Sequence, residues 1–169
     1  MNTNLNTKHT ISVLVENNAG VLSRISGLFA RRGFNIHSLA VGVTESADVS
    51  RITIVAEGDD RVLEQIAKQL NKLVDVLKVR TVKGEELLSR ELMLIKVACV
   101  PNQRHELIAI AEISGAKISD VSAASMTLEL SATSLKLAAF EELLRPYGIK
   151  EIARTGVIAL QKGAGALSM

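Results

Sequence analysis

One order of predicted strands and helices occurs twice along this chain of 169 residues, and no other feature limits the fold as strongly. In the first half, alternating apolar residues predict strands at 9–16, 35–44, 50–57 and 75–82. Apolar residues at helical spacing predict one helix that starts at residue 21 and ends at Gly33, and another at 58–74. The order β-α-β-β-α-β predicts an antiparallel four-stranded sheet with helices on one face.

The second half repeats this order after a polar connection at residues 83–91. Strands are predicted at 92–100, 117–123, 125–132 and 149–162, the last broken near Gly156; helices are predicted at 104–114, ended by Gly115, and at 134–148, opened by Ser134. We therefore predict an α+β chain with two ferredoxin-like domains at 9–83 and 84–163, and flexible tails at 1–8 and 164–169. Small domains with open sheet edges and faces favour dimerisation.

Composition places the chain among ordinary cytoplasmic proteins. The hydrophobic fraction of 47% supports a real core, and 22% of the residues are charged. No stretch approaches the roughly 18 to 20 uncharged apolar residues of a membrane helix. The polar start MNTNLNTK lacks the apolar segment of a signal peptide. The single cysteine, Cys99, fits a reducing compartment and a core position.

The charge and the aromatic content argue against nucleic-acid binding. The net charge is +2, with acidic and basic residues interleaved, so no basic footprint is present. Single-stranded nucleic acid needs a platform of stacked aromatic side chains. The aromatic residues of this chain are few and scattered: Phe29, Phe34, Phe140 and Tyr147.

Local motifs for catalysis or metal binding are absent from the sequence. The three histidines lie far apart and none stands at metal-ligand spacing from Cys, Asp or Glu: His9, His37 and His105. The phosphate loop, the zinc-binding motifs and the nucleophile elbow are all missing. The acid pair Asp59/Asp60 lies at a predicted helix start, where capping explains it. The sequence therefore predicts no active site.

The connection between the first strand and the first helix is the best candidate for a binding site. A helix N-terminus presents unpaired backbone N–H groups and the positive end of the helix dipole to a carboxylate. Gly20 leaves room for close approach, and the Asn17 and Asn18 amides can accept an ammonium group. Val21 and Leu22 would supply an apolar wall. This combination predicts a free α-amino acid with an aliphatic side chain.

A simpler explanation of the same residues needs no ligand. Asparagine is a favoured helix cap, and glycine is a favoured turn residue. The segment NNAG at 17–20 can therefore be plain turn chemistry. Spacing alone leaves both explanations open.

A family resemblance starts at these residues. The segment at 15–39, VENNAGVLSRISGLFARRGFNIHSL, resembles the first motif of ACT domains, which are βαββαβ modules that sense amino acids. More specifically it resembles the regulatory (small) subunit of acetolactate synthase, also called acetohydroxyacid synthase. The similarity continues through SRITI, LEQIAKQLNKLVDVLKV, RELMLIKV and SLKLAAFEELLRPYGIKEIARTGVIAL. It covers residues 9–161.

The resemblance implies a regulatory subunit without catalysis of its own. Such a subunit binds and activates a large catalytic subunit, which carries thiamine diphosphate, Mg²⁺ and FAD. It also confers feedback inhibition, chiefly by valine, in branched-chain amino-acid synthesis. The family's N-terminal ACT domains pair as a homodimer, with the effector at the interface.

Carried onto this sequence, the resemblance divides the effector contacts between two chains. One chain would contribute Asn17, Gly20, Val21 and Leu22, and its partner would contribute Asn35 and Ile36. Leucine and isoleucine stay alternatives to valine, because one methylene is worth only about 1 to 3 kcal/mol. His37 fills a variable position and either adds pH dependence or faces solvent. A stand-alone ACT sensor that regulates another enzyme or a transcription response stays an alternative function.

Overall fold

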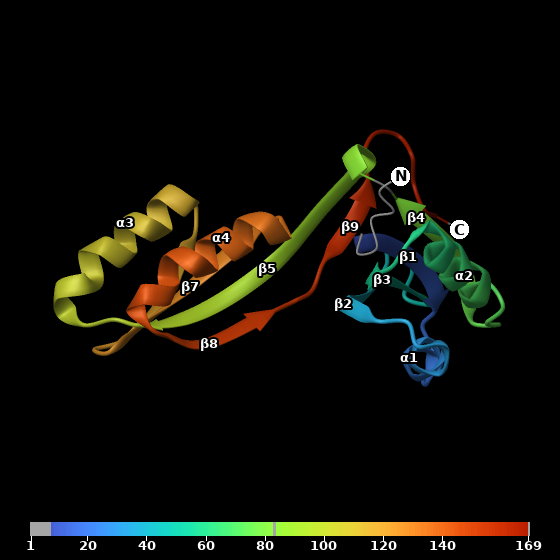
Figure 1. Cartoon of the computed structure of the whole chain (residues 1–169), viewed down its shortest axis with the longest axis horizontal. Helices are drawn as coiled ribbons and strands as arrows, with labels where there is room; N and C mark the ends of the chain where they lie inside the picture. The colour runs from blue at the N-terminus through green and yellow to red at the C-terminus, as the bar shows by residue number, and fades with distance from the viewer. Residues whose placement is uncertain (1–7, 83, 169) are drawn as a thin grey trace. The chain divides into compact units, whose positions relative to one another are not determined.

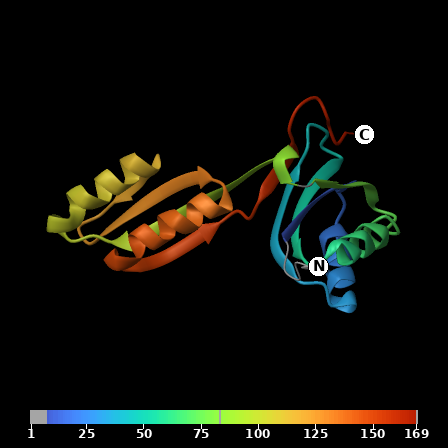
Figure 2. The same ribbon diagram turned by 45° about the horizontal axis from the view of Figure 1, so that its top comes forward.

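The computed structural model describes residues 8–82 and 84–168, which form two compact units. The first unit contains the chain up to Leu88 together with the segment from Val157 onward, and the second is Ser89–Gly156. Figure 1 shows the two units and their elements, and Figure 2 shows the same ribbon from a second direction. Because the second unit is inserted between Leu88 and Val157, the chain leaves the first unit once and then returns to it.

The first unit has the predicted βαββαβ order. Its elements are β1 (Lys8–Glu16), α1 (Val21–Arg32), β2 (Ile36–Val43), β3 (Val49–Glu57), α2 (Asp60–Leu70) and β4 (Val76–Val82). The strands form an antiparallel sheet in the order β2-β3-β1-β4. The predicted fold class is confirmed, and β2 and β4 are the edge strands.

The helix ends in this unit follow from the capping signals in the sequence. Gly33 ends α1 in the left-handed conformation, with Arg31 and Arg32 in the last turn. Asp59 precedes α2, and its carboxylate accepts a hydrogen bond from the Val62 N–H at 2.8 Å. The predicted capping role of the acid pair at 59–60 is therefore confirmed for Asp59.

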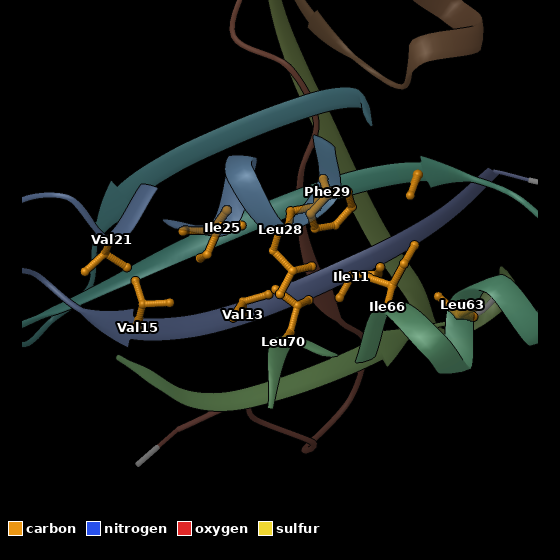
Figure 3. Close-up of a cluster of buried hydrophobic side chains, with 13 residues drawn as sticks. Ile11, Val13, Val15, Val21, Ile25, Leu28, Phe29, Leu63, Ile66 and Leu70 are labelled. Carbon is orange, nitrogen blue, oxygen red and sulfur yellow. The ribbon is translucent and has the colours of Figure 1, made fainter. Parts of the chain in front are cut away.

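The core of the first unit lies between the sheet and its two helices, as the close-up in Figure 3 shows. Alternate residues of β1 and β3 face α1 and α2 and are buried. The labelled members are Ile11, Val13, Val15, Val21, Ile25, Leu28, Phe29, Leu63, Ile66 and Leu70. One apolar side of each helix is enough to build this core.

The opposite face of this sheet is covered by the chain that returns from the second unit. This returning segment, Val157–Ser168, includes β9 (Ile158–Gln161), which pairs with β5. The short helix η1 (Gly84–Glu86) lies beside it, and the Lys162 N–H donates to the Glu86 carbonyl at 2.7 Å. A flexible tail was expected from residue 164. Instead, Leu167 packs against Leu14 and Val49.

The second unit repeats the architecture on a second sheet. Its elements are β5 (Leu87–Ala98), η2 (Pro101–Gln103), α3 (Arg104–Ser114), β6 (Lys117–Val121), β7 (Ser125–Ala132), α4 (Ser134–Leu144), η3 (Arg145–Tyr147) and β8 (Ile149–Arg154). The strand order is β6-β7-β5-β8. Cys99 lies in its core with 0% exposure, as predicted for a small buried side chain.

Several boundaries differ from those expected. The units divide after Leu88, whereas the sequence suggested residue 83. Residues 87–91 were expected in a polar connection but begin β5, where more and less buried side chains alternate as on any strand. The helix α4 begins at Ser134 as predicted, with Thr133 as its cap accepting from the Lys136 N–H, but it ends at Leu144 and not at residue 148. The closing strand is broken near Gly156, as predicted. Residues 1–7 of the expected N-terminal tail lie outside the described residues.

Candidate effector site

The N-terminus of α1 is open. Gly20 precedes the helix with φ 85°, a conformation that favours glycine, and no side chain caps this end. The first strong backbone bond of the helix joins the Arg24 N–H to the Gly20 carbonyl at 3.0 Å. The N–H groups of Leu22 and Ser23 precede that bond, so they are available to an external acceptor. This end also carries the positive pole of the helix dipole.

Among the α-helices of the described residues, α1 alone has neither an acidic residue in its first turn nor a side-chain cap. Asp59 caps α2, Glu106 lies in the first turn of α3, and Thr133 caps α4. The first turn of α1 contains no acid. The positive end of α1 is therefore not neutralised by its own residues, which leaves it suited to a carboxylate from a ligand.

The two asparagines before α1 do not cap it. The Asn17 amide donates to the Ala47 carbonyl at 2.9 Å and accepts from the Ser50 hydroxyl at 3.0 Å. The Asn18 amide donates to the Glu16 carboxylate at 2.9 Å. The asparagine cap of the simpler explanation is therefore wrong, whereas its turn chemistry agrees with the left-handed Gly20 and needs no ligand. Asn17 instead ties the β1–α1 connection to the β2–β3 turn.

A charged pair flanks the open helix end. The Arg24 guanidinium donates two hydrogen bonds to the Asp75 carboxylate, at 2.7 and 2.8 Å. Asp75 is buried, and its carbonyl also accepts from the Glu16 N–H at 2.9 Å. The Nη1 atom of Arg24 takes no part in this pair and lies 3.5 Å from where a Cβ on Gly20 would be. The pair therefore holds a guanidinium next to the open end of α1.

The two apolar residues expected to form a wall have different environments. The Val21 side chain is buried in the core beneath α1. Leu22 is 42% exposed at the helix start. In one chain, only Leu22 presents an apolar side chain at this position, and Val21 offers its backbone.

The remaining predicted residues, Asn35 and Ile36, lie at the other end of α1. The sheet register places Ile36 opposite Ala56 and at the level of His9. Asn17 directly follows the opposite end of β1, so roughly 23 Å of strand separates the two groups. One chain therefore brings together Asn17, Gly20 and Leu22 but not Asn35 and Ile36. A site that includes all of them needs a second chain.

His9 and His37 lie away from the Asn17 end of α1. The His37 Nε2 atom lies 2.9 Å from the Lys8 ammonium, and its Nδ1 atom lies 3.6 Å from the Glu57 carboxylate. The His9 ring bonds the Gly58 carbonyl at 3.0 Å. Within the described residues, no three His, Cys, Asp or Glu side chains gather as a metal site.

Sequence reasoning missed three contributors to the site's geometry. Arg24, Asp75 and Ser50 contact its residues from positions that no local motif marks. In the sequence, only the position of Arg24 in the first turn of α1 pointed to any of these contacts. In residues 8–82 and 84–168, none of the helices has both the length and the apolar character needed to cross a bilayer.

Comparison with known proteins identifies the class and then the family. A family model described as an AHAS small subunit-like ACT domain matches residues 11–78, so the first unit is an ACT domain. A second model, described as the small subunit of acetolactate synthase, matches residues 90–163. The chain belongs to the family of acetolactate synthase small subunits.

Individual relatives agree with this assignment along nearly the whole chain. A probable acetolactate synthase small subunit from Archaeoglobus fulgidus is 53% identical, over 92% of this chain and 98% of that protein. An acetolactate synthase small subunit from Mycolicibacterium smegmatis is 51% identical, over 92% and 91%. The crystal structure of the small subunit from Thermotoga maritima superposes with a TM-score of 0.88 at 40% identity, covering 94% of this chain and 99% of that one.

Proposed function

We propose that this chain is a non-catalytic regulatory subunit that activates the catalytic subunit of acetolactate synthase and makes it sensitive to feedback by valine. The open N-terminus of α1 carries the proposal. It offers the N–H groups of Leu22 and Ser23, a positive helix end and the adjacent Arg24 guanidinium to a carboxylate. Membership of the small-subunit family supplies the enzyme to be regulated.

The ammonium and the side chain of the effector would meet different groups. One lone pair of the Asn17 carbonyl oxygen is used by Ser50, which leaves the second for an ammonium group. Leu22 gives an apolar contact for an aliphatic side chain. Such a pocket favours branched-chain amino acids over polar ones, with small differences among valine, leucine and isoleucine.

A homodimer would complete the site with Asn35 and Ile36 of a second copy. The edge strand β2 supports this part of the proposal, because no other strand of the described residues pairs with its outer edge. Val41 and Val43 on this strand are 49% and 68% exposed. A long, apolar edge strand favours pairing with another copy of the chain. His37 would then lie close to the dimer boundary.

Regulation would follow from linkage. A ligand that contacts two chains binds the dimer better than separate chains, so it favours the dimer geometry that fits it. A coupling free energy of about 1 to 3 kcal/mol gives several-fold to hundred-fold control of the catalytic partner. Thiamine diphosphate, Mg²⁺ and FAD would belong to that partner and not to this chain.

The test is calorimetry followed by reconstitution. The purified chain is titrated with valine, leucine, isoleucine and serine, the last as a polar control. Saturable binding of valine but not of serine is expected. The chain is then mixed with the catalytic subunit, where higher acetolactate formation and its inhibition by valine are expected. Failure to raise activity or to confer inhibition would contradict the proposal.

The same two proteins also distinguish the proposed function from the alternative one. A stand-alone ACT sensor would bind an amino acid but would not copurify with the thiamine-dependent subunit. Copurification from cells that express both proteins therefore decides between the two roles. RNA-recognition domains share the βαββαβ order, but they stack bases on strand aromatics that this chain lacks.

A further inference from the structure

The returning segment Val157–Ser168 is attached to the ACT sheet by a few separate contacts. At its start, the Val157 N–H donates to the Ser38 hydroxyl at 2.9 Å. In the middle, Arg80 donates to the Gln161 side chain at 3.0 Å. Near its end, Arg51 donates to the Leu167 carbonyl at 2.9 Å. These contacts run along the sheet face opposite α1 and α2.

Leu167 is the apolar anchor of this segment. It is 8% exposed and forms a small cluster with Leu14 and Val49, which are 2% and 7% exposed. Leu14 alternates with the core residues of β1, so the cluster lies on the back of the sheet. Lys78 adds one further bond, to the Ser168 carbonyl at 2.8 Å. Removal of one leucine side chain therefore weakens the attachment without touching the main core.

The two ends of the segment lie behind the two half-sites that one chain would contribute. Val49 stands between Asp48 and Ser50, and both of these neighbours bond Asn17: the Asn17 N–H donates to the Asp48 carbonyl at 2.8 Å. At the other end, Ser38 follows Ile36 by two residues on β2. The Asn17 half and the Asn35–Ile36 half are therefore each one or two residues from an anchor of the segment.

We propose that the returning segment is a strap that fixes the positions of the two half-sites that one chain contributes, the Asn17 half to one effector site of the dimer and the Asn35–Ile36 half to the other, so that its attachment and effector binding are thermodynamically linked. The effector part of this inference rests on the proposed function. The chain enters the strap directly from the inserted unit Ser89–Gly156, which makes the strap a covalent route between that unit and the site. Linkage is reciprocal, so a bound effector also strengthens the attachment of the strap.

The test compares three variants of the full chain. Leu167→Ala removes the apolar anchor, and Ser38→Ala removes the bond to Val157. Leu160→Ala is the matched control, because that leucine is in the same segment but is 54% exposed. We expect the first two variants to bind valine at least about fivefold more weakly, and the control to bind like the unaltered chain. Equal valine affinity in all four proteins would overturn the proposal.

Amide hydrogen exchange tests the strap without any effector. In Leu167→Ala, faster exchange is expected at residues 12–16 and 47–52, and in Ser38→Ala at residues 36–40. Exchange like that of the unaltered chain in both variants would overturn the proposal. If the unaltered chain binds no amino acid, the proposed function fails, and the exchange measurement alone then decides whether the strap holds the two halves.

Discussion

The two units of this chain are built alike but begin their first helices differently. In the first unit, the β1–α1 connection ends in Gly20 and leaves the helix end open. In the second, the 3₁₀ turn Pro101–Gln103 leads into α3, which has Glu106 in its first turn. The fold is thus compatible with either start, and only the first one retains a free positive end. The proposed capacity to bind a small anion would therefore come from the connection and not from the architecture.

The two units also differ at the face of the sheet that points away from the helices. The returning segment covers the back of the first sheet. The back of the second sheet has a shallow pocket lined by Leu94, Lys96, Thr127, Glu151 and Ala153. In the linkage proposed above, the cover on the first sheet is the part that transmits a change to that sheet.

The largest expected effects concern the packed hydrophobic core that each unit has. Phe29 and Phe140 are 1% and 2% exposed, and each lies in the core of its own unit. Phe29→Ala and Phe140→Ala are each expected to lower the free energy of unfolding by about 3 to 5 kcal/mol, because each leaves a cavity. Urea denaturation followed by far-UV circular dichroism measures this. A loss below about 1 kcal/mol in either variant would contradict the shared packing.

Gly20→Asp tests the difference between the helix starts. The new carboxylate would lie near Arg24 and occupy the place of the effector carboxylate, and the backbone at φ 85° adds strain. We expect valine affinity to fall at least about 100-fold, because charged hydrogen bonds of about 1.5 to 3 kcal/mol each are lost. Calorimetry with valine measures the loss.

The matched control is Gln103→Asp, which places the same side chain before α3. This variant is expected to bind valine like the unaltered chain. Circular dichroism checks that both variants remain folded. Valine binding that survives Gly20→Asp, or that is lost equally in both variants, would remove the distinction between the two connections.

Asn17→Ala separates ligand binding from loop geometry. It removes the amide that is proposed to accept the ammonium group and also breaks two bonds to the β2–β3 turn. Valine affinity is expected to fall about tenfold, while activation of the catalytic subunit persists. Ser50→Ala breaks only the Ser50 bond, so it should cost less than Asn17→Ala. An equal loss in both variants would assign Asn17 a purely structural role.

The sequence predicted the element order and several helix ends because those depend on local signals. Periodicity, Gly33, Gly115 and Asp59 act within a few residues. The contacts that shape the site are not local: Arg24 and Asp75 are 51 residues apart. No sequence pattern marks such a pair.

The strap and the environment of Val21 also escaped prediction. Leu167 is a single leucine in a glycine-rich stretch, so it has no periodicity to reveal its burial. From the sequence alone, Val21 could contact a ligand or lie in the core, because the side of α1 that faces the sheet is not known; in the structure it is buried. In both cases tertiary packing decides what the local sequence leaves open.

The smallest expected effects concern two exposed ion pairs, one in each unit. A hydrogen bond and the charge of Lys68 lower the pKa of Glu64, and Arg145 lowers the pKa of Glu142 in the same way. A lowered carboxyl pKa contributes stability above the ordinary glutamate pKa, and this is lost as the pH falls through the lowered value. Because both pairs are exposed, solvent screens the gain.

Carboxyl NMR titration measures the pKa of each glutamate and so compares the two ion pairs. Lys68→Met is expected to return the pKa of Glu64 toward its ordinary value and to leave that of Glu142 unchanged, and Arg145→Met should do the reverse. Urea midpoints at neutral pH should barely move in either variant, because neither exposed pair contributes much to folding. A large shift in one midpoint only would show that the two units do not tolerate the loss of a surface charge equally. The similarity of the units would then be limited to their cores.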